Sequence, residues 1–345
     1  MKGVELSQKN KTLHGLLSVS FVLMPLVFIV ITMFIGRYPV SAPMVIDTVW
    51  SKITGIPVDV PAITQTVVWD IRLPRAILGA LVGGALAVSG ASLQGLFHNP
   101  LVDSGILGVS SGAGFGAALG IILFDNVVMI YVLSFVFSLI AVFFSYLIGR
   151  IYSTVPNIML VLGGVIVSSI FSALISFLKY VADPFDELPT IVFWLMGSLA
   201  NADYREISIS LIPILLGTLG LFALRWRINV LSLGDKEARS LGLNTRLYKI
   251  AVVIFTTLAT AGAVSVSGII GWIGLVIPHI GRMIVGNDNR YLIPASMSIG
   301  ACFLILIDNA GRMLTGSELP LSILTALVGG PFYVYLLKRT KGGGW

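Results

Sequence analysis

The chain has 345 residues, of which 56% are hydrophobic and only 11% are charged, and its formal net charge is +6. This balance excludes a water-soluble globular domain of the same length, because such a domain could not cover so much apolar surface. The composition indicates an all-α polytopic membrane protein that forms one transmembrane domain, residues 1–345.

Ten apolar segments are long enough to cross a hydrocarbon core of roughly 30 Å, which takes about 20 helical residues. Glycine and proline interrupt the third, eighth and tenth segments, so we expect these helices inside a bundle, where neighbours satisfy the freed backbone groups. The longest polar connections are expected on the outer side, at 37–75 and 181–206. The ten segments are 14–36, 76–96, 105–124, 127–149, 157–180, 207–225, 247–267, 270–286, 291–309 and 320–338.

The start of the chain resembles a secretory signal sequence, because Lys2, Lys9 and Lys11 precede an apolar run. That run is too long for a signal sequence and no small-residue cleavage site follows it, so we expect an uncleaved first span. Most Lys and Arg residues fall in alternate loops, which predicts that both termini face the cytoplasm. This bias explains the positive net charge without a nucleic-acid partner, and it places the chain in the cell membrane, in contact with lipid.

Residues 98–114, HNPLVDSGILGVSSGAG, form a polar passage between the second and third segments. Asp103 or Ser104 can cap the third helix by accepting hydrogen bonds from its first amide groups. The passage lacks the lysine and Ser/Thr of the phosphate-binding pattern GxxxxGK[ST], which occurs nowhere in the chain. If ATP drives this protein, another polypeptide must bind and hydrolyse it.

Three glycines in the same passage predict close helix packing. Gly108, Gly112 and Gly114 give the third helix a thin face. Small residues of this kind let helices approach closely in a membrane, where packing and interhelical hydrogen bonds drive association. We expect these glycines to form a packing seam.

Few ionisable residues fall inside the apolar segments. Asp308 and Arg312 are four residues apart near the outer end of the ninth segment and are expected to form a local ion pair. His279 follows Pro278 and is expected to bond a carbonyl, with a metal ligand or proton relay as the alternative, although a lone histidine makes a poor metal site. Cys302 is expected to be a buried thiol. The sequence predicts no catalytic residue, no metal site and no cofactor, and buried carboxylates are too few to favour an ion-coupled transporter.

The stretch LSLGDKEARSLGL, residues 231–243, lies in an inner connection. Asp235 is suited to cap a short helix whose first turn carries Glu237, and Gly242 is suited to end it. A short charged helix outside the bilayer predicts a docking element, with a chance surface helix as the alternative.

Six motifs occur along the chain in a fixed order. They are RLPR (72–75), GGALAVSGASLQGLFHNPLVDSGILGVSSGAG (83–114), WLMGS (194–198), LSLGDKEARSLGL (231–243), GWIGLVIPHIGR (271–282) and ELPLSILTALVGGPFY (318–333). Together they resemble the permease subunits of the FecCD family of ABC importers, which take up iron siderophores, haem and cobalamin. The resemblance covers about Arg72 to Leu337. The chain departs from the family at NPLVDS, where members commonly read NPLADP, and at Leu321-Ser322.

The resemblance implies a type II ABC importer permease fold with ten spans, and a set of partners. Such permeases work as a pair around a central path, above two copies of an ATPase that binds ATP and Mg, and receive ligand from a substrate-binding protein. A homodimer is expected, with a related heterodimer as the alternative. The ligand crosses intact by alternating access, so the chain itself is not an enzyme. An iron siderophore is the expected cargo, and haem, cobalamin and molybdate are alternatives. An ion-coupled secondary transporter is the alternative from another class.

Three sets of residues receive roles from the resemblance. The ATPase-coupling loop carries Asp235, Glu237, Ala238, Arg239, Leu241 and Gly242. Docking of the binding protein falls to Arg72, Arg75 and Arg312, whose planar groups suit carboxylates, with simple interfacial anchoring as the alternative. A cytoplasmic gate is implied near YSTVPN, at Thr154, Pro156 and Asn157, with an ordinary loop turn as the alternative.

Overall fold

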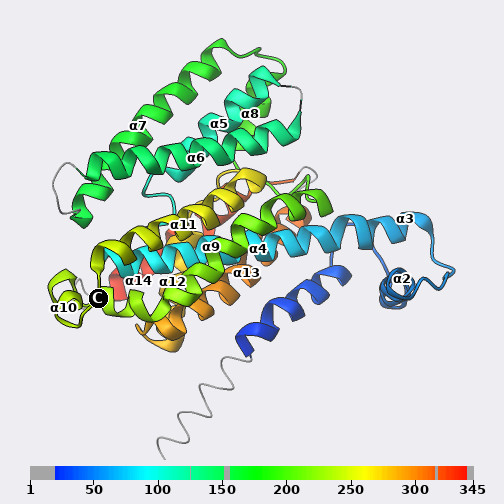
Figure 1. Cartoon of the computed structure of the whole chain (residues 1–345). Helices are drawn as coiled ribbons and strands as arrows, with labels where there is room; N and C mark the ends of the chain where they lie inside the picture. The colour runs from blue at the N-terminus through cyan, green and yellow to red at the C-terminus, as the bar shows by residue number, and fades with distance from the viewer. Residues whose placement is uncertain (1–19, 125, 151–155, 315–317, 340–345) are drawn as a thin grey trace, which may run out of the picture.

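The computed structural model describes residues 20–124, 126–150, 156–314 and 318–339, and within these ranges it contains helices and no strand. Figure 1 shows the helices packed side by side in an elongated bundle. The helices are the first helix Ser20–Phe34, α2 Ala42–Thr54, α3 Ala62–Gln65, η1 Thr66–Arg72, α4 Leu73–Phe97, α5 Val109–Leu123, α6 Val127–Gly149, α7 Asn157–Val181, α8 Glu187–Leu195, α9 Tyr204–Leu231, α10 Asp235–Ser240, α11 Thr245–Ser267, α12 Ile273–Val285, α13 Asn289–Leu314 and α14 Leu321–Arg339.

The described helices fit a multi-pass membrane protein. Six of them are long and apolar enough to cross a membrane, and four shorter apolar helices accompany them in the part of the chain that the structure describes. Each predicted segment overlaps one of these helices. The third, eighth and tenth segments, which glycine and proline interrupt, correspond to α5, α12 and α14, three of the shorter ones.

The second apolar segment begins earlier than the sequence predicted. The helix runs without a break through α3, η1 and α4, from Ala62 to Phe97, and contains one π-helical stretch. The prediction started at residue 76 because Arg72 and Arg75 interrupt the apolar run. Both arginines have partners inside the chain, so the helix continues through them.

The two long connections predicted as polar loops also contain helices. In the first connection, α2 begins next to a proline at its first turn and ends at Gly55, which has a φ of 73°. In the second connection, α8 carries Glu187 in its first turn, where a carboxylate is favourable to the helix dipole. The sequence pattern missed both because each is short and lies among polar residues.

Helix α4 is the centre of the bundle. It packs against α9, α11, α12 and α13, and 83% of the apolar window of the long helix that includes it is buried. Two glycines permit this: a Cβ atom on Gly83 would lie 2.3 Å from the backbone oxygen of Gly300, and one on Gly90 would lie 2.0 Å from that of Gly274. Backbones this close leave no room for any side chain at these positions.

Helices α5, α6, α7 and α8 form a second group beside the α4 bundle (Figure 1). A Cβ atom on Gly112 would lie 2.4 Å from the backbone oxygen of Phe137 in α6. Gly116, which the sequence analysis did not single out, is still closer to α6, at 2.2 Å from the Leu133 oxygen. Gly114 instead faces side chains of α7 and α8, so the small residues of α5 serve two neighbours.

The start of α5 differs from the prediction. Its N-cap position is Gly108, which has a φ of 86° and makes no side-chain capping bond. Asp103 and Ser104 therefore do not cap the helix. The Asp103 carboxylate accepts a hydrogen bond from the amide of Gly105 at 3.0 Å, which stabilises a turn ahead of the helix. The left-handed conformation at this position favours glycine, which has no Cβ atom to clash.

Two single residues discussed above lie inside the bundle. The thiol residue Cys302 is 3% exposed, as predicted. His279 in α12 is 7% exposed. Neither belongs to a group of three or more potential metal ligands within the described ranges.

Candidate functional site

Helix α10 lies outside the long helices, between the end of α9 and the start of α11. Gly234, with a φ of 119°, leads the chain into it, and Gly242, with a φ of 79°, leads the chain out. Ala238 is fully buried against the bundle, whereas Leu241 is 65% exposed. One face of this short helix is thus anchored and the other is free. We refer to this end of the bundle as the α10 end.

The side chain of Asp235 does not cap α10, contrary to the sequence prediction. Gly234 occupies the N-cap position, and no side chain bonds the first amides. The Asp235 carboxylate instead accepts a hydrogen bond from Lys249 Nζ in α11, at 2.6 Å between Nζ and Oδ2. The ion pair has a buried side and an open side, since the Lys249 side chain is 8% exposed and the Asp235 side chain 38%.

Lys249 also joins the predicted coupling loop to the predicted gate. Its Nζ donates a second hydrogen bond to Asn157 Oδ1 at 2.8 Å. The Asn157 amide nitrogen in turn donates to the backbone oxygen of Leu96 at 2.8 Å. A chain of three hydrogen bonds therefore connects α10, α11, the first residue of α7 and the last turn of α4.

A small cavity of about 200 Å³ lies beside these bonds, and Asp235, Arg239, Lys249 and Pro156 are among its lining residues. Pro156 is the N-cap residue of α7. The third predicted gate residue, Thr154, lies outside the described residues. The structure thus brings two of the predicted sets together, and it does so through Lys249, which the sequence analysis missed. The signal available in the sequence was a lysine near the start of the predicted segment 247–267.

A larger polar cavity of about 670 Å³ opens beside the passage that leads into α5. The passage, α7 and the turn after α11 form its walls, and the described lining contains no basic side chain. Burial raises the pKa of Asp103 above its ordinary value, against the opposing hydrogen bond from the Gly105 amide. The cavity therefore presents hydroxyl groups and one acid to a bound molecule. Its polar side chains are Asp103, Ser104, Ser110, Ser168, Ser169 and Ser172.

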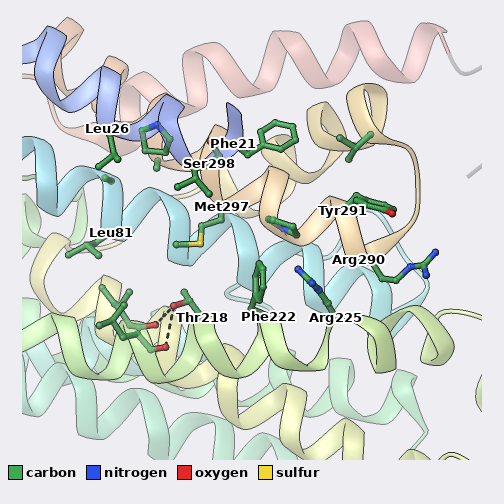
Figure 2. A pocket seen from close by; sticks show the side chains of 18 of the residues that line it. Phe21, Leu26, Leu81, Thr218, Phe222, Arg225, Arg290, Tyr291, Met297 and Ser298 are labelled. Atoms are coloured by element: carbon green, nitrogen blue, oxygen red, sulfur yellow. Dashed lines mark hydrogen bonds between the residues drawn. The ribbon is translucent and has the colours of Figure 1, made fainter. Parts of the chain in front are cut away.

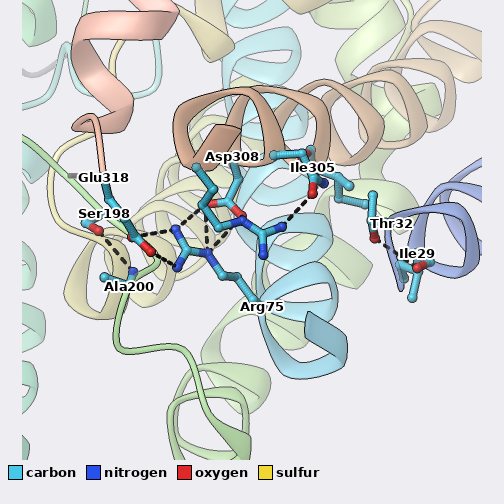
Figure 3. A network of polar contacts seen from close by, with 10 residues as sticks. Ile29, Thr32, Arg75, Ser198, Ala200, Ile305, Asp308 and Glu318 are labelled. Carbon is cyan, nitrogen blue, oxygen red and sulfur yellow. Dashed lines mark hydrogen bonds and ion pairs between the residues drawn. The ribbon is translucent and has the colours of Figure 1, made fainter. Parts of the chain in front are cut away.

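At the opposite end of the bundle, Arg75 is the centre of an internal ion-pair network (Figure 3). Its Nε and Nη2 donate to the Asp308 carboxylate at 2.9 to 3.0 Å, and its Nη1 and Nη2 donate to the Glu318 carboxylate at 2.9 and 2.8 Å. The Arg75 and Asp308 side chains are 5% and 4% exposed, and that of Glu318 is 44% exposed. We refer to this end as the Glu318 end.

Arg312 forms the predicted i,i+4 pair with Asp308, but as the weaker partner. The Nε to Oδ2 distance is 3.3 Å, longer than each contact between Arg75 and Asp308. Two bidentate contacts occupy the guanidinium of Arg75, which explains why it dominates. Arg312 keeps 13% of its side chain exposed and lines a cavity of about 200 Å³ together with Arg72 and Glu318.

Arg72 likewise turns into the chain. It is 2% exposed and donates to the backbone oxygens of Met33 and Tyr38. Its guanidinium lies across Gly36, where a Cβ atom would come within 2.6 Å of Nη2. The sequence expected all three arginines to face outward, and the structure places Arg72 and Arg75 mainly against their own chain.

Comparisons with known proteins agree with this architecture. The model of the FecCD transport family matches residues 23–339. The molybdate import permease of Haemophilus influenzae is 40% identical over 315 residues, 91% of this chain and 93% of that protein. A Helicobacter pylori permease named for iron chelatin transport is 42% identical over 276 residues, 80% of this chain and 83% of that protein. A solved inward-facing ABC transporter, proposed to be of the metal-chelate type, superposes with a TM-score of 0.83 at 37% identity, covering 93% of this chain and 98% of that one.

Proposed function

Because this chain belongs to the FecCD transport family, we propose that it is the permease subunit of a binding-protein-dependent ABC importer that carries an iron chelate into the cytoplasm. The observation that carries the proposal is the match of the family over residues 23–339, which includes α10 and all six of the long apolar helices. The chain binds no nucleotide in this scheme. A separate ATPase, present in two copies, binds ATP and Mg and does the hydrolysis.

We assign the ATPase contact to the free face of α10. Lys236, Glu237 and Arg239 are exposed there, and Leu241 adds an apolar contact. An exposed leucine within a charged rim is the composition expected of a small docking surface. Ala238 and Gly242 serve this face indirectly, since Ala238 holds the helix on the bundle and Gly242 forms its end.

The chain of hydrogen bonds through Lys249 supports a route for coupling. A shift of α10 on the ATPase would move Asp235, and Lys249 would pass that movement to Asn157 at the start of α7. Asn157 is also bonded to α4, so α7 would move relative to the central helix. In this role Asn157 is a hinge contact of the inner gate, with Pro156 fixing the direction in which the chain enters α7.

The cavity of about 670 Å³ beside the passage into α5, called the serine-lined cavity below, supports a path for the ligand. It lies on α7, whose apolar side chains Ile158, Val165, Ile166 and Ile170 are all exposed in the single chain. We propose that a second copy of the permease covers this face and that the two cavities join on the axis between the copies. The five serine hydroxyl groups can release a hydrated chelate easily because they offer it neutral hydrogen bonds, and Asp103 is the one acid among the polar side chains of the lining.

Docking of the substrate-binding protein is assigned to the Glu318 end. Arg312 and Arg72 both line the hollow there, and Arg312 is the one we assign to a visiting carboxylate, because the guanidinium of Arg72 donates to backbone oxygens of its own chain. Arg75 acts from inside, because its five hydrogen bonds to Asp308 and Glu318 set the position of these two carboxylates. The partners of this end would thus meet a surface of mixed charge.

Uptake by reconstituted transporter tests the proposal. The chain is placed in proteoliposomes with its ATPase and its binding protein, and entry of radiolabelled ferric siderophore, molybdate, haem and cobalamin is followed with and without ATP. We expect ATP-dependent entry of the ferric siderophore. Entry of molybdate alone would show that the transported ligand is an oxyanion and not an iron chelate, as the name of the molybdate permease says of that protein. Entry that needs no ATPase and stops with a protonophore would overturn the ABC mechanism in favour of an ion-coupled transporter.

A further inference from the structure

Another cavity of the described chain lies away from the sites above. It has a volume of about 770 Å³ and lies between the first helix, α4, α9 and α13. Its walls are mainly apolar, and Figure 2 shows Leu26 and Leu81 at one end and Arg225 and Arg290 at the other. A recess with an apolar body and a basic end is amphipathic in the same sense as a phospholipid.

The basic end has an excess of positive charge. Arg225 lies over the ring of Phe222, with 4.1 Å between Cζ and the ring centroid, and takes part in none of the ion pairs among the described residues. Arg290 is paired with Asp288 and keeps 50% of its side chain exposed. With one carboxylate for two guanidinium groups, the cavity end carries about one uncompensated positive charge. An anion is the complementary ligand.

The depth of the cavity matches one leaflet of a bilayer. Along α9 its lining runs from Ile214 to Trp226, a rise of about 18 Å along the helix axis. Along α13 it runs from Arg290 to Ala301 in the opposite direction, about 16 Å. Half of a hydrocarbon core of roughly 30 Å is about 15 Å. Both helices thus place the basic end at the level of the headgroups and the apolar end near the middle of the membrane.

The aromatic residues at the basic end fit the same level. Trp226 is 51% exposed and lines the cavity beside Tyr291. Tryptophan and tyrosine are enriched where the headgroups meet the hydrocarbon core. The cavity is thus enclosed by four helices, and it extends from the headgroup level toward the middle of the membrane.

We propose that this cavity is a specific site for one anionic diacyl phospholipid, with its phosphate between Arg225 and Arg290 and one acyl chain along Leu81 and Thr218 (Figure 2). The bound lipid fills the space between the first helix and the α4 bundle. The site is independent of the transported substrate, since its lining shares no residue with the serine-lined cavity.

Lipid retention by the full chain tests the site. The protein is placed in nanodiscs of phosphatidylcholine and phosphatidylglycerol in equal amounts, and the lipids that stay bound after release are counted by native mass spectrometry. We expect the wild-type chain to retain phosphatidylglycerol in preference to phosphatidylcholine. Arg225→Gln should reduce that retention about fivefold, the effect of one arginine near a membrane surface. Met297→Trp should reduce it by filling the cavity from α13 while leaving both arginines in place.

Arg227→Gln is the matched control. Arg227 lies on the same helix two residues further along and contacts the rings of Trp226 and Tyr248, but it does not line the cavity. Its loss should leave retention unchanged. An equal loss in Arg227→Gln and Arg225→Gln would overturn the proposal, because it would show general attraction to the membrane surface. Equal retention of phosphatidylcholine would overturn the anionic class, and unchanged retention in a folded Met297→Trp chain would overturn the location.

Discussion

The ammonium group of Lys249 donates to the carboxylate of Asp235 at 2.6 Å, and this bond ties the short helix α10 to the transmembrane helix α11. Lys249 donates a second hydrogen bond to Asn157, so one buried cation connects α10 with the start of α7, two elements that are far apart in the sequence. A contact of this kind gives the permease a defined point at which movement outside the bundle can enter it.

Replacing Lys249 should separate ATP hydrolysis from transport. In Lys249→Met the apolar stem stays and both hydrogen bonds are lost, so we expect uptake to fall about tenfold or more while the ATPase still binds. Breaking the pair should also lower the free energy of unfolding by about 1 to 3 kcal/mol, less than for a fully buried pair because Asp235 is partly exposed. Lys52→Met, at an exposed lysine in the last turn of α2, should keep coupling. An equal loss of coupling in both variants would argue against the Lys249 route.

A charge on the free face of α10 should weaken ATPase binding. Leu241→Asp alters a residue that is 65% exposed, so the fold should be retained. If Leu241 is an anchor of the interface, its loss costs about 2 kcal/mol, or about thirtyfold in affinity. Binding of the purified ATPase to the permease in nanodiscs measures this. The matched variant Ile56→Asp changes an aliphatic residue that is 54% exposed far from α10 and should bind normally.

Replacing Arg75 should lower the stability of the fold, in addition to any effect on docking. Arg75→Met leaves the buried Asp308 carboxylate with Arg312 alone, and breaking a buried pair costs about 3 to 5 kcal/mol. Thermal unfolding in detergent should show this, with a smaller loss for Arg312→Met. Removing both charges in Arg75→Met with Asp308→Leu should recover much of the stability. Wild-type stability in Arg75→Met, together with lost uptake, would show that Arg75 acts by docking alone.

The glycine seam between α5 and α6 should reject even a methyl group. In Gly112→Ala the new Cβ would meet the backbone oxygen of Phe137 at 2.4 Å, so the helices must separate, at a cost of about 1 to 3 kcal/mol. Gly271→Ala is the control, because nothing lies within 4 Å of its added Cβ. Unfolding midpoints of the two variants should differ clearly, and equal midpoints would mean that the α5–α6 contact adjusts without cost.

Acid should weaken the Glu318 end. Burial disfavours the charged form of Glu318, but the hydrogen bond and the charge of Arg75 outweigh it and hold the pKa of Glu318 below its ordinary value of 4.5. A lowered pKa in the folded state gives stability that is complete above 4.5 and is lost as the pH falls through the folded value. Glu318→Gln should therefore lose less stability than the wild type between neutral and strongly acidic pH. Identical pH profiles of unfolding would contradict the pairing.

Local patterns predicted much of the fold. Continuous apolar runs such as those of α6 and α7 were found within a few residues, because composition alone decides what can lie in lipid. Element boundaries failed where a distant partner decides the outcome. The second segment appeared to start at residue 76 because nothing near Arg75 announces Asp308, which is 233 residues away.

The candidate site shows the same contrast between local features, which the sequence predicts, and contacts between distant residues, which it does not. The short helix at 235–240 was predicted from glycines and charges within a few residues of it. The link from this helix to Asn157 could not be predicted, because the two hydrogen bonds of Lys249 join residues that are 14 and 92 positions apart. The serine-lined cavity was missed because its walls come from three separate parts of the chain, and the polar passage was interpreted as a cap and a packing seam only.

The long separation between Arg75 and its two carboxylates has a consequence for biosynthesis. At roughly 5 to 20 residues per second, the ribosome needs on the order of 10 to 50 s to add the 233 residues between Arg75 and Asp308. During that interval α4 is already made, yet its arginine has neither of its final partners. The newborn helix must keep this guanidinium near water or lipid phosphate, and it can reach its full depth only when α13 arrives. The central helix α4 can therefore take its final position only after the last quarter of the chain has been synthesised.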